Sequence, residues 1–416
     1  MKRDVWILKL LFLVQLAAAG AFMNYINLYL EQVIELTGSQ IGLVQMVSLI
    51  FLVLVNPIWG LIADKTGKYN LLLRISLLSA VFVALMYFHV HTFALIVVVA
   101  VIFECVRAGI IPLSEVITTN YCERVGYDFS KVRVFGSIGW MLGGMLVGFL
   151  IDGMSFDFAG IQFNFDGMFN LGLAMFGTYI VFRLIGLGLA FFMPKDQVVA
   201  SDEQDNGASE DSRVAKSGMS DLRILLANKR FMFIMFLIAI SITTVDTANG
   251  YSAMHLVTTL GAQPSIISWF MFAAVMPEII FLPFGGFLTR KLGFKNVYYI
   301  AIMTMLVRIG VYSFTTSTTV FLVVSMVHVF GVIMHVSGNI AYIRKVVPAG
   351  QMALAFTVMS SIVALTRAIL GFIFGWIYEN TSSFMMFRVT GIILIVALLV
   401  VMRSKSLSDF EASSAR

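Results

Sequence analysis

The stretch Pro-Ile-Trp-Gly-Leu-Ile-Ala-Asp-Lys-Thr-Gly at residues 57–67 indicates the fold, because a second stretch of the chain repeats its spacing. Residues 283–293 read Pro-Phe-Gly-Gly-Phe-Leu-Thr-Arg-Lys-Leu-Gly, so that Pro, Gly, Lys and Gly recur at matching places. Each stretch lies in a basic loop between the second and third long apolar segments of its half of the chain. The repeat therefore predicts two related halves in which these loops occupy equivalent positions.

The composition is typical of a membrane protein. Of the 416 residues, 59% are hydrophobic and 12% are charged, whereas soluble domains carry about 25% charged residues. A bilayer span needs about 20 apolar residues, and spans are helical because their backbone groups must pair internally. We predict an all-α polytopic membrane protein with twelve transmembrane helices. The predicted spans are 6–30, 41–63, 70–89, 93–120, 133–152, 167–193, 230–256, 266–289, 296–315, 319–343, 351–377 and 384–402.

Lysine and arginine are distributed unevenly between the loops. The stretches without either residue are 30–40, 89–93, 152–167, 257–266, 315–320 and 377–383, whereas the alternate loops and both ends are basic. Basic loops stay in the cytoplasm, so we predict a multi-pass protein of a bacterial cytoplasmic membrane with both termini inside. The first span is expected to be uncleaved. This bias explains the net charge of +5 without a nucleic-acid partner.

The predicted organisation is two six-helix halves, residues 1–193 and 230–403, with a linker at 194–229 and a tail at 404–416. The linker is polar, acidic and poor in aromatic residues, which is typical of a flexible segment. We place the linker and the tail in the cytoplasm.

The sequence predicts neither an enzyme nor a metal site. Its two cysteines, Cys105 and Cys122, lack metal-ligand spacing, and no nucleotide-binding loop or nucleophile elbow is recognisable. A membrane sensor is disfavoured because no signalling domain is recognisable either. The expected partners are a small-molecule solute and the lipid bilayer, and the expected state is a functional monomer. No cofactor is expected besides a coupled proton.

Ionisable residues inside apolar spans are candidate functional groups, because they are costly there and usually face a cavity. In the span 93–120, Glu104, Arg107 and Glu115 fall along one helical face, which we expect to point inward. Arg133 and Trp140 occupy the next span, although Arg133 could also be a positive-inside anchor. The second half contributes Asp246, Glu278, Arg308, His328 and Arg367.

The loop at residues 60–68 resembles the signature of the major facilitator superfamily, and the resemblance extends over the whole chain. It implies the major facilitator fold and transport by alternating access. Asp64 could pair with a basic group or a helix end in one conformation only; the alternative is a tight turn with a solvated charge. The predicted gating-loop residues are Gly60, Asp64, Lys65, Gly67, Arg290, Lys291 and Gly293.

A narrower resemblance is to the lactose permease family of oligosaccharide:proton symporters. It is carried by Pro112-Leu-Ser-Glu115, by Arg133 with the following Phe-Gly-x-x-Gly-Trp140, and by the spacing from Arg308 to His328. The resemblance implies that the carboxylate and the guanidinium bind sugar hydroxyls and that the indole stacks on a sugar ring. The predicted substrate-binding residues are Asn27, Glu115, Arg133, Trp140, Arg308 and His328.

Proton coupling is assigned to an overlapping set, which is Glu104, Arg107, Asp246, Glu278, His328 and Arg367. Asp246 and Arg367 resemble an interhelical charge pair, and Glu278 is placed as in sucrose permease and nucleoside:proton symporters. Gly331 stands where lactose and sucrose permeases carry a coupling glutamate. We therefore hypothesise that Glu278 carries the proton and that movement of Arg308 switches it. Coupling through Glu115, Asp246 or a histidine, or no coupling at all, stays open, as does a packing role for His328.

The predicted function is proton-coupled uptake of a small polar solute, with a sugar or oligosaccharide as the first choice. Nucleoside and aromatic-acid symporters share the arginine–aromatic–glycine pattern and are alternatives. A drug:proton antiporter is an alternative of another class. Such antiporters usually have a Gly-Pro pair in the fifth span, whereas residues 136–144 contain glycines without proline.

Overall fold

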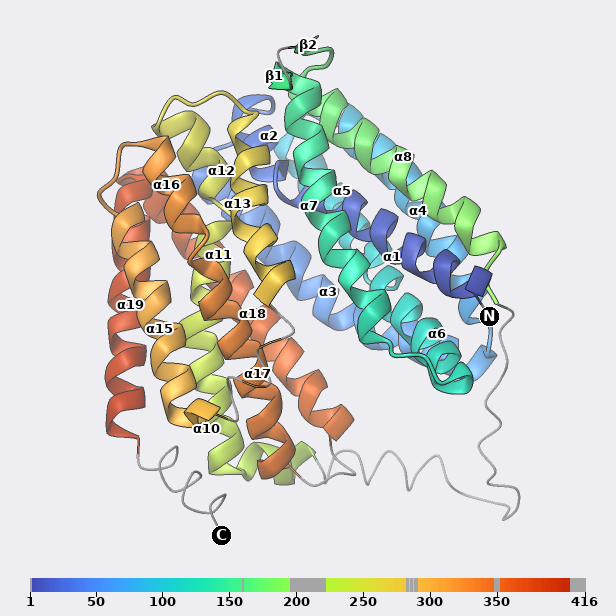
Figure 1. Ribbon diagram of the computed structural model, residues 1–416, viewed down its shortest axis with the longest axis vertical. Coiled ribbons are helices and arrows are strands. Elements are labelled where there is room, and N and C mark those ends of the chain that lie inside the picture. Colours follow the sequence, from blue (N-terminus) through green and yellow to red (C-terminus); the bar gives the residue numbers. More distant parts are fainter. Residues whose placement is uncertain are drawn as a thin grey trace.

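The chain folds into a bundle of long helices (Figure 1). The computed structural model describes residues 2–158, 161–194, 222–281, 284, 287, 291–347 and 352–404. The helices lie side by side in two groups. We call the helices of residues 2–191 the first group and those of residues 229–403 the second group.

The first group begins with a broken span, because α1 ends at Met23 and α2 begins at Ile26. Its helices are α1 (Lys2–Met23), α2 (Ile26–Gln32), α3 (Gly38–Thr66), α4 (Tyr69–His89), α5 (Phe93–Arg107), α6 (Ile110–Val125), α7 (Ser130–Asp152) and α8 (Leu171–Phe191).

The second group begins with a span in which π-helical turns alternate with α-helix. This span consists of α10 (Lys229–Ile238), η1 (Ala239–Thr243), α11 (Thr244–Asn249), α12 (Ser252–Met254) and η2 (His255–Thr259). The other helices are α13 (Ile266–Phe281), α15 (Phe294–Tyr312), α16 (Thr318–Ser325), α17 (His328–Val346), α18 (Met352–Asn380) and α19 (Ser383–Arg403). The break after Asn249 falls at Gly250, and glycine is a weak helix former.

Glycines on α7 allow α1 to pack directly against its backbone. A Cβ added at Gly139 would lie 2.0 Å from the carbonyl oxygen of Leu13, and one at Gly143 would lie 1.9 Å from that of Ala17. Lipid supplies no hydrophobic force between helices, so close backbone packing at small residues holds spans together.

A short β-hairpin departs from the all-α prediction. Strand β1 (Gly153–Phe158) pairs antiparallel with β2 (Ile161–Asp166), within the loop predicted at 152–167. Residues 154–158 and 161–165 alternate apolar and polar types, which is the period of a strand. The hairpin is an addition to a fold that is otherwise all-helical.

Each predicted span overlaps a helix, within the described residues. Nine helices of that part of the chain are long and apolar enough to cross a membrane, and two shorter apolar ones are Ile266–Phe281 and Thr318–Gly331. The number of twelve crossings stays a prediction. Among the boundaries that differ, the fourth span ends at Val125 and not at residue 120, and the sixth begins at Leu171 and not at residue 167, because the hairpin precedes it.

Both repeated loops contain a glycine with positive φ, but their backbones turn differently, since ψ is 8° at Gly67 and 165° at Gly293. Gly67 (φ 64°) ends α3 and Gly293 (φ 79°) precedes α15, so both adopt a backbone conformation that favours glycine. Asp64 accepts a hydrogen bond from the Tyr69 hydroxyl at 2.6 Å. A Cβ at Gly60 would meet no atom within 4 Å, so no other helix of the described residues packs closely on Gly60 in this conformation. Arg290 lies outside the described residues.

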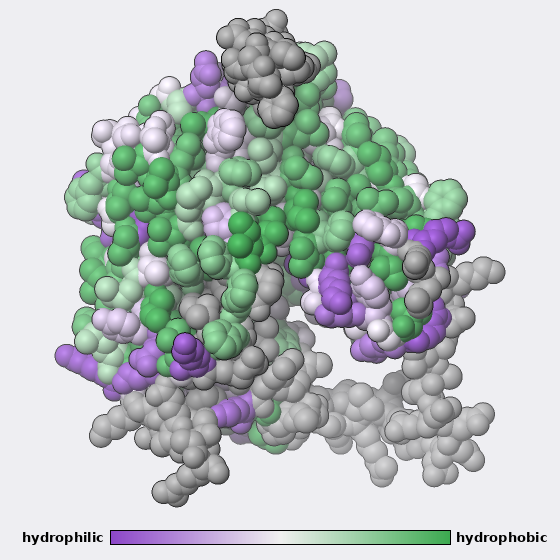
Figure 2. All heavy atoms as spheres, in the orientation of Figure 1, coloured by the Kyte–Doolittle hydropathy of each residue, from purple (hydrophilic) through white to green (hydrophobic). Residues whose placement is uncertain are grey.

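The outer surface of both groups is strongly apolar. Figure 2 shows hydrophobic residues over the sides of the molecule and hydrophilic ones mainly toward its ends. Large side chains are exposed there, among them Phe82 (60%) and Leu95 (55%). An apolar surface of this extent suits a lipid environment.

Among the described residues, the hydrogen bonds between the two groups gather at the end that carries the hairpin, which we call the closed end. They join Asn27 to Gly250, Glu31 to Thr258 and Tyr378, Ser39 to Glu379, Ser265 to Asp152 and Ser268 to Met145. Away from this end, the surface is hollowed between the two groups (Figure 2).

Candidate substrate cavity

A cavity of about 700 Å³ lies between the two groups. Helices α1, α2, α3, α4, α5 and α7 line it from the first group, and α11, α12, α13, α15, α17 and α18 line it from the second. Cavities of this size hold small-molecule ligands.

Most of the predicted substrate and coupling residues meet at this cavity. Those that line it are Asn27, Glu104, Arg133, Trp140, Asp246, Glu278, Arg308, His328 and Arg367. Arg107 and Glu115 are not part of the lining, although each pairs with a residue that is.

The fourth span is interrupted at Ala108 and Gly109, between α5 and α6, so that Glu104 and Arg107 lie on α5 and Glu115 lies on α6. A common inward face for the three residues stays a prediction. The ring of Trp59 occupies the break, where a Cβ at Gly109 would lie 2.6 Å from it. Arg107 forms an ion pair with Glu104, so the carboxylate that reaches the cavity from α5 is already neutralised.

Arg133 and Glu115 form a loose pair. The Arg133 Nε lies 3.6 Å from Glu115 Oε1, and both side chains are more than 40% exposed. Trp140 follows Arg133 by two helical turns and therefore lies on the same side of α7. This arrangement leaves guanidinium donors and an aromatic face available to a ligand.

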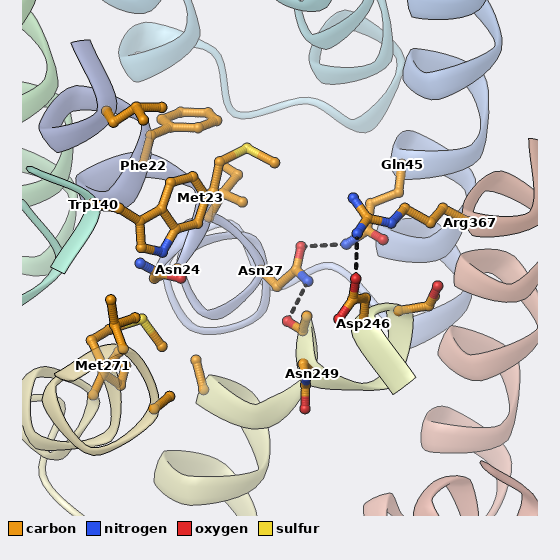
Figure 3. A pocket seen from close by; sticks show the side chains of 18 of the residues that line it. Phe22, Met23, Asn24, Asn27, Gln45, Trp140, Asp246, Asn249, Met271 and Arg367 are labelled. Carbon is orange, nitrogen blue, oxygen red and sulfur yellow. Dashed lines mark hydrogen bonds and ion pairs between the residues drawn. The ribbon is translucent and has the colours of Figure 1, made fainter. Parts of the chain in front are cut away.

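Asp246 and Arg367 form an ion pair across the second group. The Arg367 Nη2 donates to Asp246 Oδ2 at 2.8 Å, joining α18 to α11 beside Gln45 (Figure 3). The charge pair implied by the resemblance is thus present in the geometry.

Arg308 is a buried cation held by neutral groups. Its side chain is 1% exposed, and it donates to the Tyr312 hydroxyl at 3.0 Å, to Asn249 Oδ1 and to His328 Nδ1. The ring of Tyr312 stacks on Phe321 with 3.7 Å between centroids. This network fixes the guanidinium at the break in the seventh span.

Glu278 stands alone. It is half-buried on α13 and forms no hydrogen bond or ion pair with the described residues. The charged groups that act on it electrostatically are Asp246 and Arg133. The predicted influence of Arg308 on Glu278 is therefore not seen in this conformation, because Arg308 is held by Asn249 and His328.

Asn27 bridges the two groups more than it faces the cavity. Its Nδ2 donates to the Gly250 carbonyl at 2.8 Å, and its Oδ1 accepts from Gln45 Nε2 at 2.6 Å (Figure 3). Both amide atoms are thus engaged within the protein, and only 4% of the residue is exposed.

Sequence reasoning missed Gln45 and Asn249, which also line the cavity. An Asn-Gly pair inside an apolar span is a breaker signal and could have pointed to Asn249. Gln45 carries no such signal, because a lone glutamine in a span has no partner that the sequence identifies.

Gly331 has a packing role. It is buried, and a Cβ there would lie 2.9 Å from the Met305 side chain of α15. A glutamate at this position would displace Met305.

Comparison with known proteins gives the same assignment as the fold. Residues 5–389 match the family described as MFS_1 like. The chain belongs to this family. One relative is named as an uncharacterized transporter, YwbF, of Bacillus subtilis (strain 168). It is 24% identical over 395 residues, which are 94% of this chain and 91% of the relative.

Other relatives of this MFS_1 like chain have names that state a solute. Raffinose permease of Escherichia coli is 24% identical, with 82% of this chain and 78% of the permease covered. The probable 3-phenylpropionic acid transporter of Escherichia coli (strain K12) is 23% identical, with 74% of each chain covered. A mutant of the nucleoside transporter NupG superposes with a TM-score of 0.79 at 16% identity, covering 96% of this chain and 98% of that one.

The chain is therefore a major facilitator transporter that spans the membrane several times. It is not an enzyme, since its relatives are permeases and transporters.

Proposed function

We propose that this transporter couples the uptake of a small polar solute to a proton, with Glu278 as the proton carrier. The observation that carries the proposal is the isolation of Glu278. The other acidic residues of the cavity, Glu104 and Asp246, are ion-paired, and Glu115 pairs with Arg133. Protonation of Glu278 breaks no ion pair, whereas protonation of any of these three would leave an unpaired cation at membrane depth, which is costly.

The lining supports a neutral, hydroxyl-rich solute such as a sugar or oligosaccharide. Together with their ion-pair partners, the charged lining residues comprise four arginines and four acidic residues, so no cation is in surplus while Glu278 is ionised. They are Arg107, Arg133, Arg308 and Arg367, and Glu104, Glu115, Asp246 and Glu278. Guanidinium and carboxylate groups together donate to and accept from hydroxyls, and Trp140 offers an apolar face. The relative named as raffinose permease is in keeping with this class of solute.

The halves 1–193 and 230–403 would rock about the cavity, with 194–229 as their linker. The closed end comprises stretches without Lys or Arg, which the positive-inside rule assigns to the outside. The conformation described here is then open toward the cytoplasm.

The test uses the purified protein in proteoliposomes. Counterflow is measured with raffinose, maltose, melibiose, uridine and 3-phenylpropionic acid, and we expect at least one of the three sugars to exchange. Exchange of only the acid or the nucleoside would overturn the proposed solute class.

Coupling is then tested with the exchanged solute and an imposed pH difference. Glu278→Gln should retain exchange but lose accumulation against the solute gradient. Glu123→Gln, an exposed carboxylate at the end of α6, is the control and should accumulate solute as the wild type does. Continued accumulation by Glu278→Gln would remove Glu278 as the carrier.

A further inference from the structure

Glu31 occupies an unusual place at the closed end. It lies on α2, in the first group, and both of its carboxylate oxygens accept hydrogen bonds from the second group. Oε1 accepts from the Tyr378 hydroxyl of α18 at 2.7 Å, and Oε2 accepts from the Thr258 hydroxyl of η2 at 2.7 Å. One side chain thus ties two helices of the second group to the first.

No cation stabilises this carboxylate. Among the described residues, Tyr378 and Thr258 are its only polar partners, and no charged group acts on it electrostatically. The neighbouring titratable groups have other partners. His255 of η2 contacts the Ser383 hydroxyl at 2.8 Å, and Tyr251 donates to the Gly371 carbonyl at 2.6 Å. The loops of this end contain no Lys or Arg that could replace a cation.

Two other carboxylates cross the same seam but are held differently. Glu379 accepts from the backbone N–H of Ser39 at 2.8 Å, in the first turn of α3. A helix N-terminus favours the ionised form of a carboxylate. Asp152 accepts from the backbone N–H of Ser265 at 2.5 Å. Glu31 has neither a helix end nor a backbone donor, so its ionised form receives the least support.

We propose that Glu31 is a second proton-binding site, separate from the cavity, and that its protonation opens the closed end. The ligand is a proton from the medium at that end. An ionised carboxylate accepts both hydroxyl hydrogen bonds with charge assistance, which roughly doubles their strength. A bound proton removes the charge, so both hydrogen bonds lose their charge assistance. The protonated oxygen also becomes a donor, so its hydroxyl partner can no longer donate to it and must turn to accept instead.

The direction of the effect follows from this chemistry. Hydrogen bonds that favour the ionised carboxylate hold the two groups together at neutral pH, and acid releases them. If the closed end faces outward, as its lack of Lys and Arg predicts, acid outside favours the outward-open state. The same external acidity supplies the proton for the proposed uptake. Protonation of Glu31 would therefore open the cavity to the side from which the proton comes.

The closed end can be observed without any solute. Spin labels are attached at Val33→Cys, near the end of α2, and at Gln263→Cys, in the second group, after Cys105 and Cys122 are replaced by serine. Both labelled positions are exposed. Distance distributions are recorded for the full chain in nanodiscs at pH 7.5 and pH 5.5. We expect a longer distance to gain population at the lower pH.

Glu31→Gln should show the longer distance at both pH values, with the ratio of closed to open states about tenfold lower at pH 7.5. Glu35→Gln is the matched control, since Glu35 lies at the same end and is exposed, and it should respond to pH as the wild type does. Tyr378→Phe keeps the carboxylate but removes one donor to its ionised form, so opening should occur at a higher pH than in the wild type.

The proposal is overturned if the wild-type distances are the same at both pH values, or if Glu31→Gln still responds to pH. It is also overturned if Glu379→Gln, and not Glu31→Gln, removes the response. Glu278→Gln should keep the pH response of the closed end, which separates this proposal from the one on the coupled proton.

Discussion

Asn27 of α2 donates a hydrogen bond over 2.8 Å to the carbonyl oxygen of Gly250, at the break between α11 and α12. The carbonyl that the break frees from helical pairing thus finds its donor in the other group. Gln45 fixes the orientation of the Asn27 amide from α3. The side chain of Asn27 therefore connects the broken first span to the break in the seventh span, and this hydrogen bond is one of those at the closed end.

Asn27→Ala should loosen this joint. A lost hydrogen bond costs about 1 kcal/mol, so the open population should rise roughly fivefold. The measurement is the rate at which an impermeant maleimide labels Val275→Cys, a cavity residue, in the cysteine-free chain. Asn296→Ala is the control, because Asn296 donates within the second group, to the Leu292 carbonyl just before α15, at 3.0 Å. An unchanged labelling rate in Asn27→Ala would show that the bridge does not hold the closed end.

Arg133→Lys should weaken solute binding by about tenfold or more. The loose contact with Glu115 at 3.6 Å leaves the planar guanidinium free to donate to a ligand, and an ammonium cannot reproduce that fork. The affinity is measured by protection of a cavity cysteine with the solute found by counterflow. Retained affinity in a folded Arg133→Lys protein would take Arg133 out of the binding site.

Asp246 and Arg367 should behave as a pair. Removing one partner leaves an unpaired charge in the cavity, so Asp246→Asn and Arg367→Gln should each reduce uptake by roughly tenfold, and the double variant should recover part of it. Uptake and surface expression are measured together for all three. If the double variant instead loses as much uptake as the two single losses combined, the two residues do not serve to neutralise each other.

Gly143→Ala should lower the stability of the protein. The added methyl group would meet the Ala17 carbonyl oxygen at 1.9 Å, and such overpacking costs about 1–3 kcal/mol. Gly177→Ala is the matched control, since no atom lies within 4 Å of a Cβ there. Thermal unfolding in detergent should show a lower midpoint for Gly143→Ala only. Equal midpoints would mean that α1 and α7 can separate freely.

The orientation in the membrane can be tested by labelling whole cells. Cysteines at Val33 and Gln263, both exposed at the closed end, should react with an impermeant reagent from outside. A cysteine at Ser209 in the linker should react only after the cells are opened. Labelling of Ser209→Cys in intact cells would reverse the predicted topology.

The sequence by itself determined the helical membrane fold and the family. Apolar runs of span length leave helices as the only way to satisfy the backbone in lipid, and the matched loops at 57–67 and 283–293 disclose the two halves. Glycine at residues 67 and 293 is in keeping with the positive φ found at both positions, because only glycine adopts positive φ without strain. The polar residues of the cavity could be found for a related reason, since a charge inside a span must face something other than lipid.

Only the tertiary structure decided which of these residues act together. Glu278 is isolated because Arg308 is turned toward Asn249 and His328, and this depends on a break in another helix. Glu104 pairs with Arg107 three residues further along α5, whereas Glu115 pairs with Arg133 of another helix. The role proposed for Glu31 depends on its hydrogen bonds with two hydroxyls that are distant in the sequence. Sequence periodicity assigns a residue to a face of its own helix, whereas hydrogen bonds between helices depend on breaks and packing that arise only when all the helices are assembled.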